Sequence, residues 1–557
     1  MNLILKEYLS LLKESNELDR LVPDLLLAMG IKPLSRTQVG PRQYGVDLAA
    51  VGNDPHNNNL KTLFLFTIKQ GNITRNVWNE VNVGVKDSLD EILHVYIGNN
   101  IPPLHHALPI KIIVCTGGGM EQTVEQNWSG YQRANIRPNV SFDFWGGDQL
   151  APLISSHLMS EHLLPQGLRS LLRKSLALIS DVDYDCSDFY ELSRKLIIEP
   201  DFGDLTKASS RRNVIKALNT LNLCTNVVFY WAQSDDNLKQ AMKCAERALL
   251  NSWHVVRKAH LVTKPTIVAA FTEIHVTLAK VQKTYFEKVR PHTKVESGFS
   301  GYSRFSILES LNVFEHLGFL SNAGIMATEL ALALGRPDLA NDYIKTVCDF
   351  VQNHKALNAP LYDEHIIEIF ITFEFLLLNG QDKFVRDWLH EIVNQSVFAY
   401  NILGRNFPVC NDSFEDLVSV CITGDIEKND LMYLSTLYAV LMELCVAKEW
   451  EEEFQFIKEN IKLLGECDLQ VWYPCAETDD FLYISNAGYD SGNTVAPITY
   501  ESPLKDMRVA MKNFKDANYN TPNMQISSLY SGWNALPLIA SRHFRTPILP
   551  HFWEKYL

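Results

Sequence analysis

Apolar and polar positions divide the chain into a strand-containing first part and a helical remainder. Runs rich in β-branched and aromatic residues, typical of strands buried on both faces, lie in the first 165 residues or so. Stretches with apolar residues three and four positions apart precede and separate them, as in amphipathic helices. The resulting order of helix, two strands, helix, strand, helix and strand predicts an α/β sandwich around a mixed central sheet. The predicted strands are 44–51, 63–69, 110–116 and 140–145.

The predicted helices of this part are bounded by recognisable start and stop signals. A helix over 18–30 ends on Gly30, and a longer helix over 76–97 turns six apolar residues to one side. Asp148 is predicted to cap a helix that follows the last strand. Gly117–Gly119 predicts a tight strand-to-helix turn, because no Lys-Ser/Thr pair follows to make a phosphate-binding loop. The six apolar residues are Val77, Val81, Val85, Leu89, Ile92 and Leu93.

Beyond Gly167 the strand signal disappears, and helices joined by short turns continue to about residue 465. Two stretches, 334–344 and 379–389, share a glycine turn, an acid and an aromatic–aliphatic pair, and a looser third copy begins at Glu449. They resemble tetratricopeptide-like repeats, which stack into a solenoid with a concave face. The offset of 45 exceeds the usual period of about 34 residues, so we predict an irregular helical repeat.

The last part of the chain is richer in Gly, Asn, Pro and aromatic residues, with one interrupted helix near 504–514. The basic and aromatic stretch 540–547 is interpreted as a packed terminal cap, with a binding surface as the alternative. We therefore predict three domains: an α/β domain over 1–165, an all-α helical-repeat domain over 166–465, and an irregular C-terminal cap over 466–557.

Composition limits the classes of function. The chain has 557 residues and a formal net charge of −14, which argues against a general nucleic-acid binder that needs a basic surface. Residues 1–160 carry 13 Lys and Arg against 15 Asp and Glu, so this part is nearly neutral. Ten cysteines without a CxxC motif, no signal peptide and no long apolar run predict a cytoplasmic protein with reduced thiols and no membrane segment.

The candidate chemistry lies on the first two long strands. Asp47 lies on the first, Lys69 ends the second, and the polar turn 53–59 joins them. A lysine at the end of an apolar strand needs a partner or a substrate, and Asp47 is the expected partner. A carboxylate and a lysine on neighbouring strands are the minimum for metal-assisted phosphodiester hydrolysis, in which the carboxylate binds Mg²⁺ and the lysine orients water and offsets negative charge.

Gly45-Val46-Asp47, the hairpin, Thr67-Ile68-Lys69 and the following helix resemble the PD-(D/E)xK nuclease core, in particular its Mrr-type restriction-endonuclease branch. The resemblance covers about the first 165 residues. It implies DNA cleavage with Mg²⁺ or Mn²⁺, Asp47 as a metal ligand and Lys69 as a catalytic residue. The first helix of that fold would place Asp19 as a further acid, and a solvated helix charge is the alternative.

The sequence departs from the family at Thr67, where an acidic residue or glutamine is usual. Three explanations remain open: Glu80 on the next helix completes the metal site, Asp47 and a main-chain carbonyl suffice, or the site is degenerate. The residues expected to contact phosphate are Arg36, Arg42, Gln70 and Arg75.

The resemblance implies an effector nuclease of bacterial anti-phage defence that its helical domain regulates. A protein partner or a phage-derived trigger would then bind the helical domain, and the protein could form a homo-oligomer. Two other classes remain: a degenerate nuclease fold that binds nucleic acid or a partner, and a helical-repeat adaptor subunit of a multi-protein defence complex.

Overall fold

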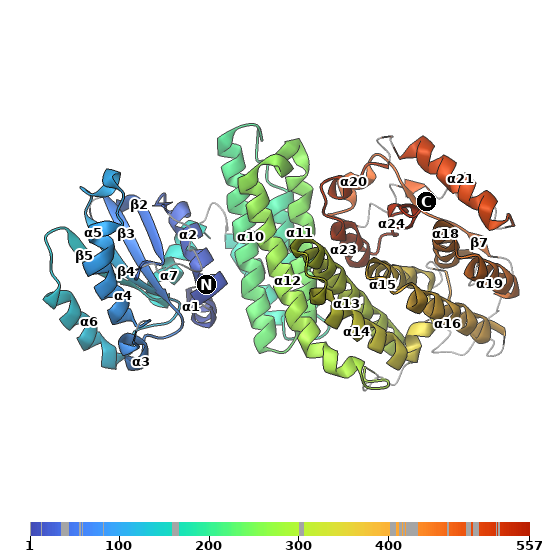
Figure 1. Ribbon diagram of the computed structural model, residues 1–557, viewed down its shortest axis with the longest axis horizontal. Helices are drawn as coiled ribbons and strands as arrows, with labels where there is room; N and C mark the ends of the chain where they lie inside the picture. Colours follow the sequence, from blue (N-terminus) through green and yellow to red (C-terminus); the bar gives the residue numbers. More distant parts are fainter. Residues whose placement is uncertain are drawn as a thin grey trace. The chain divides into compact units, whose positions relative to one another are not determined.

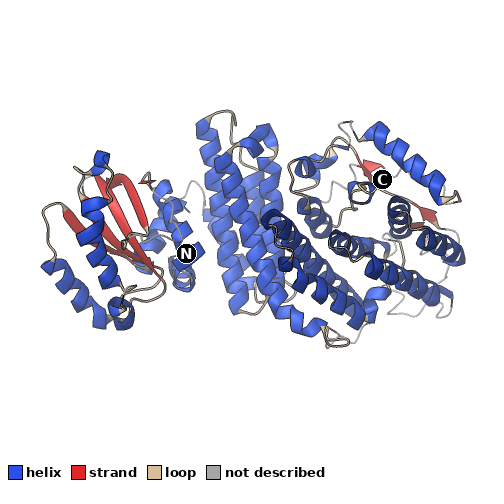
Figure 2. Cartoon of the chain, in the orientation of Figure 1, coloured by secondary structure: helices blue, strands red, loops and turns tan. Residues whose placement is uncertain are grey.

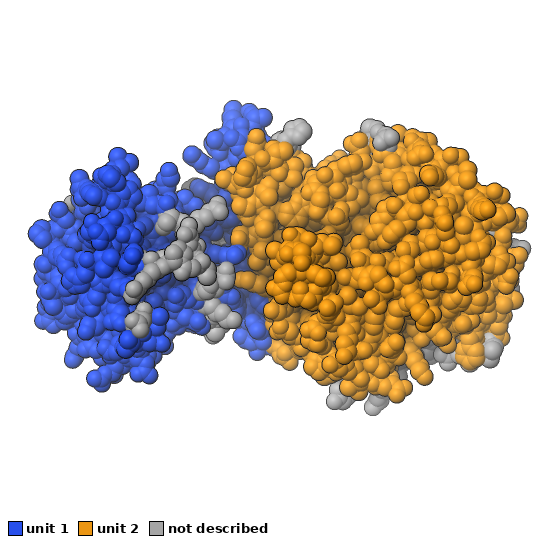
Figure 3. All heavy atoms as spheres, in the orientation of Figure 1, with its two compact units in different colours: residues 1–235 blue, residues 236–557 orange. Residues whose placement is uncertain are grey.

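The computed structural model divides into two compact units, residues 1–235 and residues 236–557 (Figure 3). The structure describes residues 2–557 except for 13, 35–43, 55–56, 58, 82, 159–165, 300–305, 402–407, 411–414, 416–417, 419–432, 465–466, 486–491, 494–500, 520 and 522–523.

The first unit contains a five-stranded mixed sheet in the order β1-β2-β3-β4-β5 (Figure 2). The first three strands pair antiparallel, whereas β3, β4 and β5 pair parallel. The prediction of a mixed sheet is therefore confirmed, and only the two-residue edge strand β1 has no counterpart in the sequence analysis. The strands are β1 (Lys32–Pro33), β2 (Leu48–Asp54), β3 (Leu60–Lys69), β4 (Ile110–Thr116) and β5 (Val140–Trp145).

Helices cover both faces of this sheet (Figure 1). On one face, Leu63 and Leu65 of β3 join a core in which Trp78 packs edge-on against Trp128 at 6.1 Å. On the other, Phe66 contacts Trp145 at 5.3 Å. Alternate residues of β3 thus serve opposite faces, which explains its nearly unbroken apolar run. The helices here are α1 (Asn2–Leu11), α2 (Asp19–Ala28), α3 (Arg75–Asn79), α4 (Val85–Glu91), α5 (Ile97–Asn99), α6 (Gln122–Ala134) and α7 (Gly147–Leu153), with π-helical turns η1 (Glu14–Leu18), η2 (Ile92–Tyr96) and η4 (Ile154–Leu158).

Two local predictions are wrong. The helix expected over 76–97 is interrupted: α3 ends at Asn79 and α4 begins at Val85, with Gly84 at its N-cap. Val81, expected on the apolar side of one continuous helix, is 75% exposed in the connection. Low helix propensity of β-branched residues and glycine explains the break. Asp148 is not a cap either, because Gly146 holds that position and the Asp148 carboxylate pairs with Lys6 at 2.5 Å.

The glycine run after β4 is a tight turn, as predicted. A Cβ atom on Gly117 would lie 1.9 Å from the carbonyl oxygen of Leu9 in α1, so a side chain has no room there. The Gly147 amide donates to the Gly118 carbonyl oxygen at 2.7 Å, which ties the start of α7 to the same turn. The glycines therefore permit close packing of three segments.

Helices beyond the predicted boundary at residue 165 belong to the first unit. They are α8 (Gln166–Leu178), α9 (Ser187–Ser193) with the π-helical turn η5 (Arg194–Ile198), and α10 (Ala208–Ser234). The α10 helix packs against α1, α8 and η4, which explains why it groups with the sheet domain rather than with the helices that follow.

The second unit is almost entirely helical within its described residues. Its long helices are α11 (Leu238–Val256), α12 (Pro265–Thr293), α13 (Ser306–Leu334), α14 (Asp338–Asn353), α15 (Ile366–Leu378), α16 (Asp382–Asn401), α18 (Leu437–Lys448), α19 (Glu451–Ile461), α21 (Leu504–Asn518) and α23 (Ala535–Phe544). Short helices are α20 (Thr478–Phe481), α22 (Ser527–Tyr530) and α24 (His551–Glu554), and two strand pairs join β6 (Leu434–Ser435) to β7 (Asp468–Leu469) and β8 (Tyr473–Pro474) to β9 (Gly492–Asn493).

The three stretches compared in the sequence share one turn geometry. Gly335, Gly380 and Glu449 each follow a helix with a positive φ, at 62°, 70° and 57°. In each case the next amide donates to a carbonyl five residues back, as in the Schellman motif. These bonds are Arg336 to Ala331 at 2.8 Å, Gln381 to Leu376 at 2.9 Å and Trp450 to Cys445 at 2.8 Å. All three stretches are therefore helical hairpins closed in the same way.

The basic and aromatic stretch 540–547 is packed inside the second unit. Its helix α23 contacts α11, α13 and α15, and the side chain of Arg542 is 4% exposed. The interpretation of this stretch as packed rather than as a binding surface is thus confirmed for Arg542. The predicted helix near 504–514 is present and continues to Asn518.

One helix of the described residues, over Ile307–Leu334 of α13, is long and apolar enough to cross a membrane. In the structure, 67% of that stretch is buried by the other helices of the unit. A buried core helix of a soluble protein has the same length and composition, so this helix is weak evidence for a membrane segment.

Candidate active site

The register of β2 and β3 brings Asp47 to the end of the central strand. Leu48 lies opposite Phe66, and the Asp47 amide continues the ladder by donating to the Phe66 carbonyl oxygen at 2.8 Å. One carboxylate oxygen of Asp47 then accepts the Ile68 amide at 2.7 Å. Asp47 is thus fixed next to the C-terminal end of β3, and its second carboxylate oxygen is left for another partner.

Lys69 ends β3 and is half-buried. Its positive charge acts on both Asp47 and Glu14, lowering the pKa of each carboxyl against the effect of burial. Within the described residues Lys69 forms no ion pair closer than 4.0 Å. The predicted pairing with Asp47 is therefore a longer-range interaction than expected, and the ammonium group is not held by a structural partner.

Two further acids come from the segment before the sheet. Asp19 begins α2, as predicted, and its charge acts on Asp47. Glu14, in the π-helical turn η1, acts together with Asp19, Asp47 and Lys69 but was not anticipated. An α-helix rotates by about 100° per residue and would turn positions 14 and 19 to different sides. The wider π-helical turn changes that relation, and no periodic sequence signal announces it.

The electrostatics of this cluster are dominated by negative charge. Burial raises the pKa of Asp47, and the Ile68 amide, Lys69 and Thr67 oppose the rise while Asp19 adds to it. Burial also raises the pKa of Glu14, where Lys69 opposes the rise and Asp47 and Asp19 add to it. Lys69 thus acts on two carboxyl groups, Asp47 and Glu14, on which Asp19 acts as well, and a bound cation would stabilise the charged forms of Asp47 and Glu14.

The donor set suits a hard cation held by few protein ligands. Within the described residues, no group of three or more His, Cys, Asp or Glu side chains lies close enough to hold a metal ion jointly. Mg²⁺, however, keeps several waters and often uses only one or two carboxylates. Asp47 with either Asp19 or Glu14 meets that requirement.

Thr67 occupies the position at which the resembled family carries an acid. Its side chain is fully buried beside Asp47, and its hydroxyl makes no hydrogen bond of normal geometry with any described residue. A neutral, buried hydroxyl is a poor ligand for Mg²⁺. Thr67 therefore shapes the environment of Asp47 rather than extending the donor set.

Three of the other predicted site residues, Glu80, Gln70 and Arg75, have exposed side chains. Glu80 is the exposed C-cap residue of α3 and is not among the charges that act on Asp47 or Glu14, and its place in a metal site stays a prediction. Gln70 and Arg75 are both exposed, after β3 and at the start of α3. Arg36 and Arg42 lie outside the described residues.

Comparison of this chain with protein-family models, with curated proteins and with solved structures finds no match. Fold and site together define a mixed α/β unit with acidic residues near one lysine, followed in the chain by a mainly helical unit.

Proposed function

We propose that the first unit is a metal-dependent nuclease that hydrolyses DNA phosphodiester bonds. The observation that carries the proposal is the pair of half-buried carboxyl groups of Glu14 and Asp47, on both of which the charge of Lys69 acts, while Lys69 forms no close ion pair with a described residue. Half-buried acids in excess over bases need a cation, and a lysine without a structural partner is available to a phosphate.

The residues have distinct roles in this proposal. Asp47 is the main ligand for Mg²⁺ or Mn²⁺, because the Ile68 amide fixes its orientation, and Asp19 or Glu14 is the second. When bound, the cation would polarise the scissile phosphate. The Lys69 ammonium group orients the attacking water and offsets the negative charge that develops on the phosphate.

The second unit is the proposed regulatory part. Its three helical hairpins with a common closing turn support a repeat-like surface that binds a protein partner or a phage-derived trigger. By the resemblance described above, the whole chain would then act in the cytoplasm as an effector of bacterial anti-phage defence, and a homo-oligomer fits the same scheme.

The decisive test is cleavage of supercoiled plasmid, linear duplex DNA and single-stranded RNA with Mg²⁺ or Mn²⁺, with EDTA as the negative control. Lys69→Met should abolish cleavage, whereas Lys61→Met should leave it intact. Lys61 is the matched control because it is an exposed lysine near the other end of β3. Equal activity of wild type and Lys69→Met would contradict the mechanism.

One observation favours a second candidate, a nuclease-like fold that binds nucleic acid without cleaving it. Thr67, buried and neutral, removes one acid from the position where the resembled family has it. In that case the protein would bind DNA with equal affinity with and without Mg²⁺, and Asp47→Asn would not change that affinity. Electrophoretic mobility shifts of a duplex in Mg²⁺ and in EDTA distinguish the two candidates.

A further inference from the structure

Two connecting segments meet at the edge of the sheet where Lys69 lies. The strands β3 and β4 are parallel neighbours, and Lys69 at the end of β3 is paired with Thr116 at the end of β4. The segment 70–73 leaves β3 at this edge, and the glycine turn 117–119 leaves β4 beside it. The backbone that follows the candidate catalytic lysine is therefore next to a second, tightly packed turn.

Three hydrogen bonds join the segment 70–73 to the end of β4 and its glycine turn. The Ile73 amide donates to the Gly119 carbonyl oxygen at 2.9 Å. The Gly119 amide donates to Oδ1 of Asn72, also at 2.9 Å. The hydroxyl of Thr116 donates to the Gly71 carbonyl oxygen. Two of the three bonds thus depend on a side chain, that of Asn72 or that of Thr116.

The hydroxyl of Thr116 is used as a donor and as an acceptor. Besides donating to Gly71, it accepts the Gly118 amide at 3.3 Å. Thr116 is fully buried, so bulk water does not replace these bonds when the hydroxyl is removed. A buried carbonyl or amide that loses its partner is costly, which makes this hydroxyl a specific requirement of the contact.

The approach of the two backbones is too close for a side chain at position 118. A Cβ atom on Gly118 would lie 2.6 Å from the carbonyl carbon and oxygen of Gly71 and 2.5 Å from Oδ1 of Asn72. Gly71 itself has a positive φ of 63°, which favours glycine there as well. The two segments are therefore packed backbone against backbone, with Thr116 and Asn72 supplying the polar contacts.

This contact bears on Lys69 because it lies at the very end of its strand. Gly71 and Asn72, the residues held by hydrogen bonds from Thr116 and Gly119, are only two and three positions further along the chain. They hold the backbone from which the Lys69 side chain extends. A catalytic group must be held within a fraction of an ångström of its productive position, and a shift of about 1 Å can cost a large part of the rate.

We propose that Thr116 and Asn72 are positioning residues for the active site: their hydrogen bonds hold the segment 70–73 against the glycine turn 117–119 and so fix the end of β3 that carries Lys69. The consequence for cleavage rests on the proposed function, whereas the contact itself is a property of the chain alone. In this scheme Thr116 acts through Lys69 and touches neither metal nor substrate.

The first experiment measures hydrogen–deuterium exchange of the Ile73 and Gly119 amides in the full chain. Thr116→Val keeps the shape of the side chain and removes the hydroxyl, and it should speed this exchange by about 10-fold, as expected for one lost hydrogen bond. Asn72→Leu, a change at an exposed position that the fold tolerates more easily, should speed exchange of Gly119. Exchange at the wild-type rate in both variants would overturn the inference.

The matched control is Thr62→Val. Thr62 is a buried threonine near the other end of β3, and its hydroxyl also donates to a backbone carbonyl oxygen, that of Leu60, at 2.9 Å. Its replacement removes the same group from the same sheet and should leave exchange of Ile73 and Gly119 unchanged. Thermal unfolding of both variants shows whether their losses of stability are similar.

The second experiment measures the kinetics of DNA cleavage. Thr116→Val should lower kcat by about 10-fold and change KM by less than about 2-fold, because a misplaced catalytic group affects the transition state more than substrate binding. Thr116→Ser restores the hydroxyl and should recover most of the rate. Thr62→Val should cleave as wild type, which a merely structural role of Thr116 would not explain if both variants are equally stable.

The two proposals fail in different ways. If the wild-type protein cleaves no nucleic acid, the proposed nuclease function is wrong, and the exchange of Ile73 and Gly119 in Thr116→Val still decides whether Thr116 holds the segment 70–73. If the wild type cleaves DNA in a manner that depends on Lys69 and Thr116→Val cleaves it equally fast, the nuclease proposal stands and the positioning inference is wrong.

Discussion

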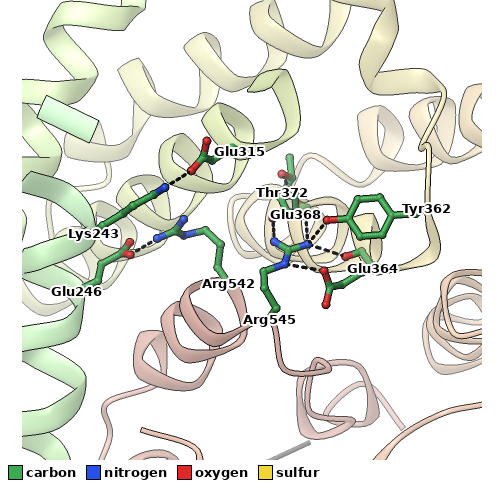
Figure 4. Close-up of polar contacts among 9 residues, drawn as sticks. All are labelled: Lys243, Glu246, Glu315, Tyr362, Glu364, Glu368, Thr372, Arg542 and Arg545. Carbon is green, nitrogen blue, oxygen red and sulfur yellow. Dashed lines mark hydrogen bonds and ion pairs between the residues drawn. The ribbon is translucent and has the colours of Figure 1, made fainter. Parts of the chain in front are cut away.

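The charged clusters of the two units are built on opposite principles. In the second unit each acid of the interior cluster meets a base (Figure 4): Arg542 binds Glu246, Arg545 binds Glu364 and Glu368, and Lys243 binds Glu315 at 2.9 Å. In the first unit, the charge of Lys69 acts on both Glu14 and Asp47, and Lys69 forms no close ion pair with a described residue.

The pKa shifts express the same difference. Burial alone would raise the pKa of Glu315, but Lys243 and Lys239 outweigh it and lower that pKa to about 2. In the first unit the effect of burial exceeds the opposing effects, and the pKa values of Asp47 and Glu14 are raised. A cluster in which each acid pairs with a base stabilises the fold without a ligand. Half-buried acids in excess over bases, by contrast, are stabilised by binding a ligand.

A third arrangement shows that surplus acid alone does not make a metal site. Glu443 of α18 and Glu554 of α24 are both fully buried, and the charge of Glu554 raises the pKa of Glu443 further above the effect of burial. Trp553 donates to Glu443 at 2.7 Å and Tyr473 to Glu554 at 3.3 Å. Because water is excluded and neither carboxylate forms an ion pair with a described residue, a proton neutralises this pair at modest cost.

The largest effect is expected from breaking a compensated pair. Arg542→Met removes the arginine from the buried Glu246, which keeps only His543 at 3.2 Å, and should destabilise the second unit by about 3–5 kcal/mol, measured by urea unfolding. The double variant Arg542→Met with Glu246→Gln should recover most of that loss. If the single variant is as stable as wild type, Arg542 does not compensate Glu246.

Substitution of Lys69 should reduce the activity of the protein and not its stability. Lys69→Met is expected to reduce the cleavage rate by at least about 100-fold, the loss typical of one removed transition-state stabiliser. Its unfolding free energy should match or exceed that of wild type, because a half-buried charge without a close partner costs stability. A large loss of stability would place Lys69 with the structural pairs.

The buried pair Glu443–Glu554 predicts that stability falls as the pH rises, which is opposite in sign to the effect of carboxylates that pair with bases. Burial raises the pKa of Glu554 to about 7 from a usual 4.5, so the folded state holds a proton that the unfolded state loses. This contribution is fully present below about pH 4.5 and is lost as the pH rises through about 7, on the order of 2–3 kcal/mol.

Urea unfolding at pH 5.5 and pH 8 measures this contribution. Glu554→Gln, which keeps an oxygen acceptor for Tyr473, should reduce the difference in stability between the two pH values. Some dependence should remain, because burial also raises the pKa of Glu329 to about 7 and that of Asp363 to about 6. An undiminished difference in Glu554→Gln would assign the effect to those groups.

The smallest effect is expected at Glu80. Its side chain is exposed and does not act on Asp47, so Glu80→Ala should change the rate of cleavage by less than about 2-fold. Glu14→Ala, by contrast, should weaken metal-dependent cleavage clearly. A strong loss of cleavage in Glu80→Ala would support the prediction from the sequence that Glu80 completes the metal site.

Much of the first unit could be predicted because its signals are local. The runs 110–116 and 140–145 are strands with the predicted bounds, and the helix expected over 18–30 is α2. The prediction of one helix over 76–97 was wrong because Val81 continues the apolar spacing although its side chain is exposed. Periodicity alone does not distinguish a packed face from an exposed connection.

The sequence by itself determined the elements and one half of the site. Turn residues and apolar runs set β2 beside β3, and that pairing places Asp47 near Lys69; glycines at 335 and 380 likewise mark where helices turn, because their positive φ is a local requirement. Tertiary structure decided the rest. It packed the π-helical turn η1 against α2 and β3, where the charges of Asp47 and Lys69 act on Glu14, and it paired Arg542 with Glu246 across 296 residues. These contacts between charged side chains depend on burial and on neighbouring charges, which exist only in the packed chain.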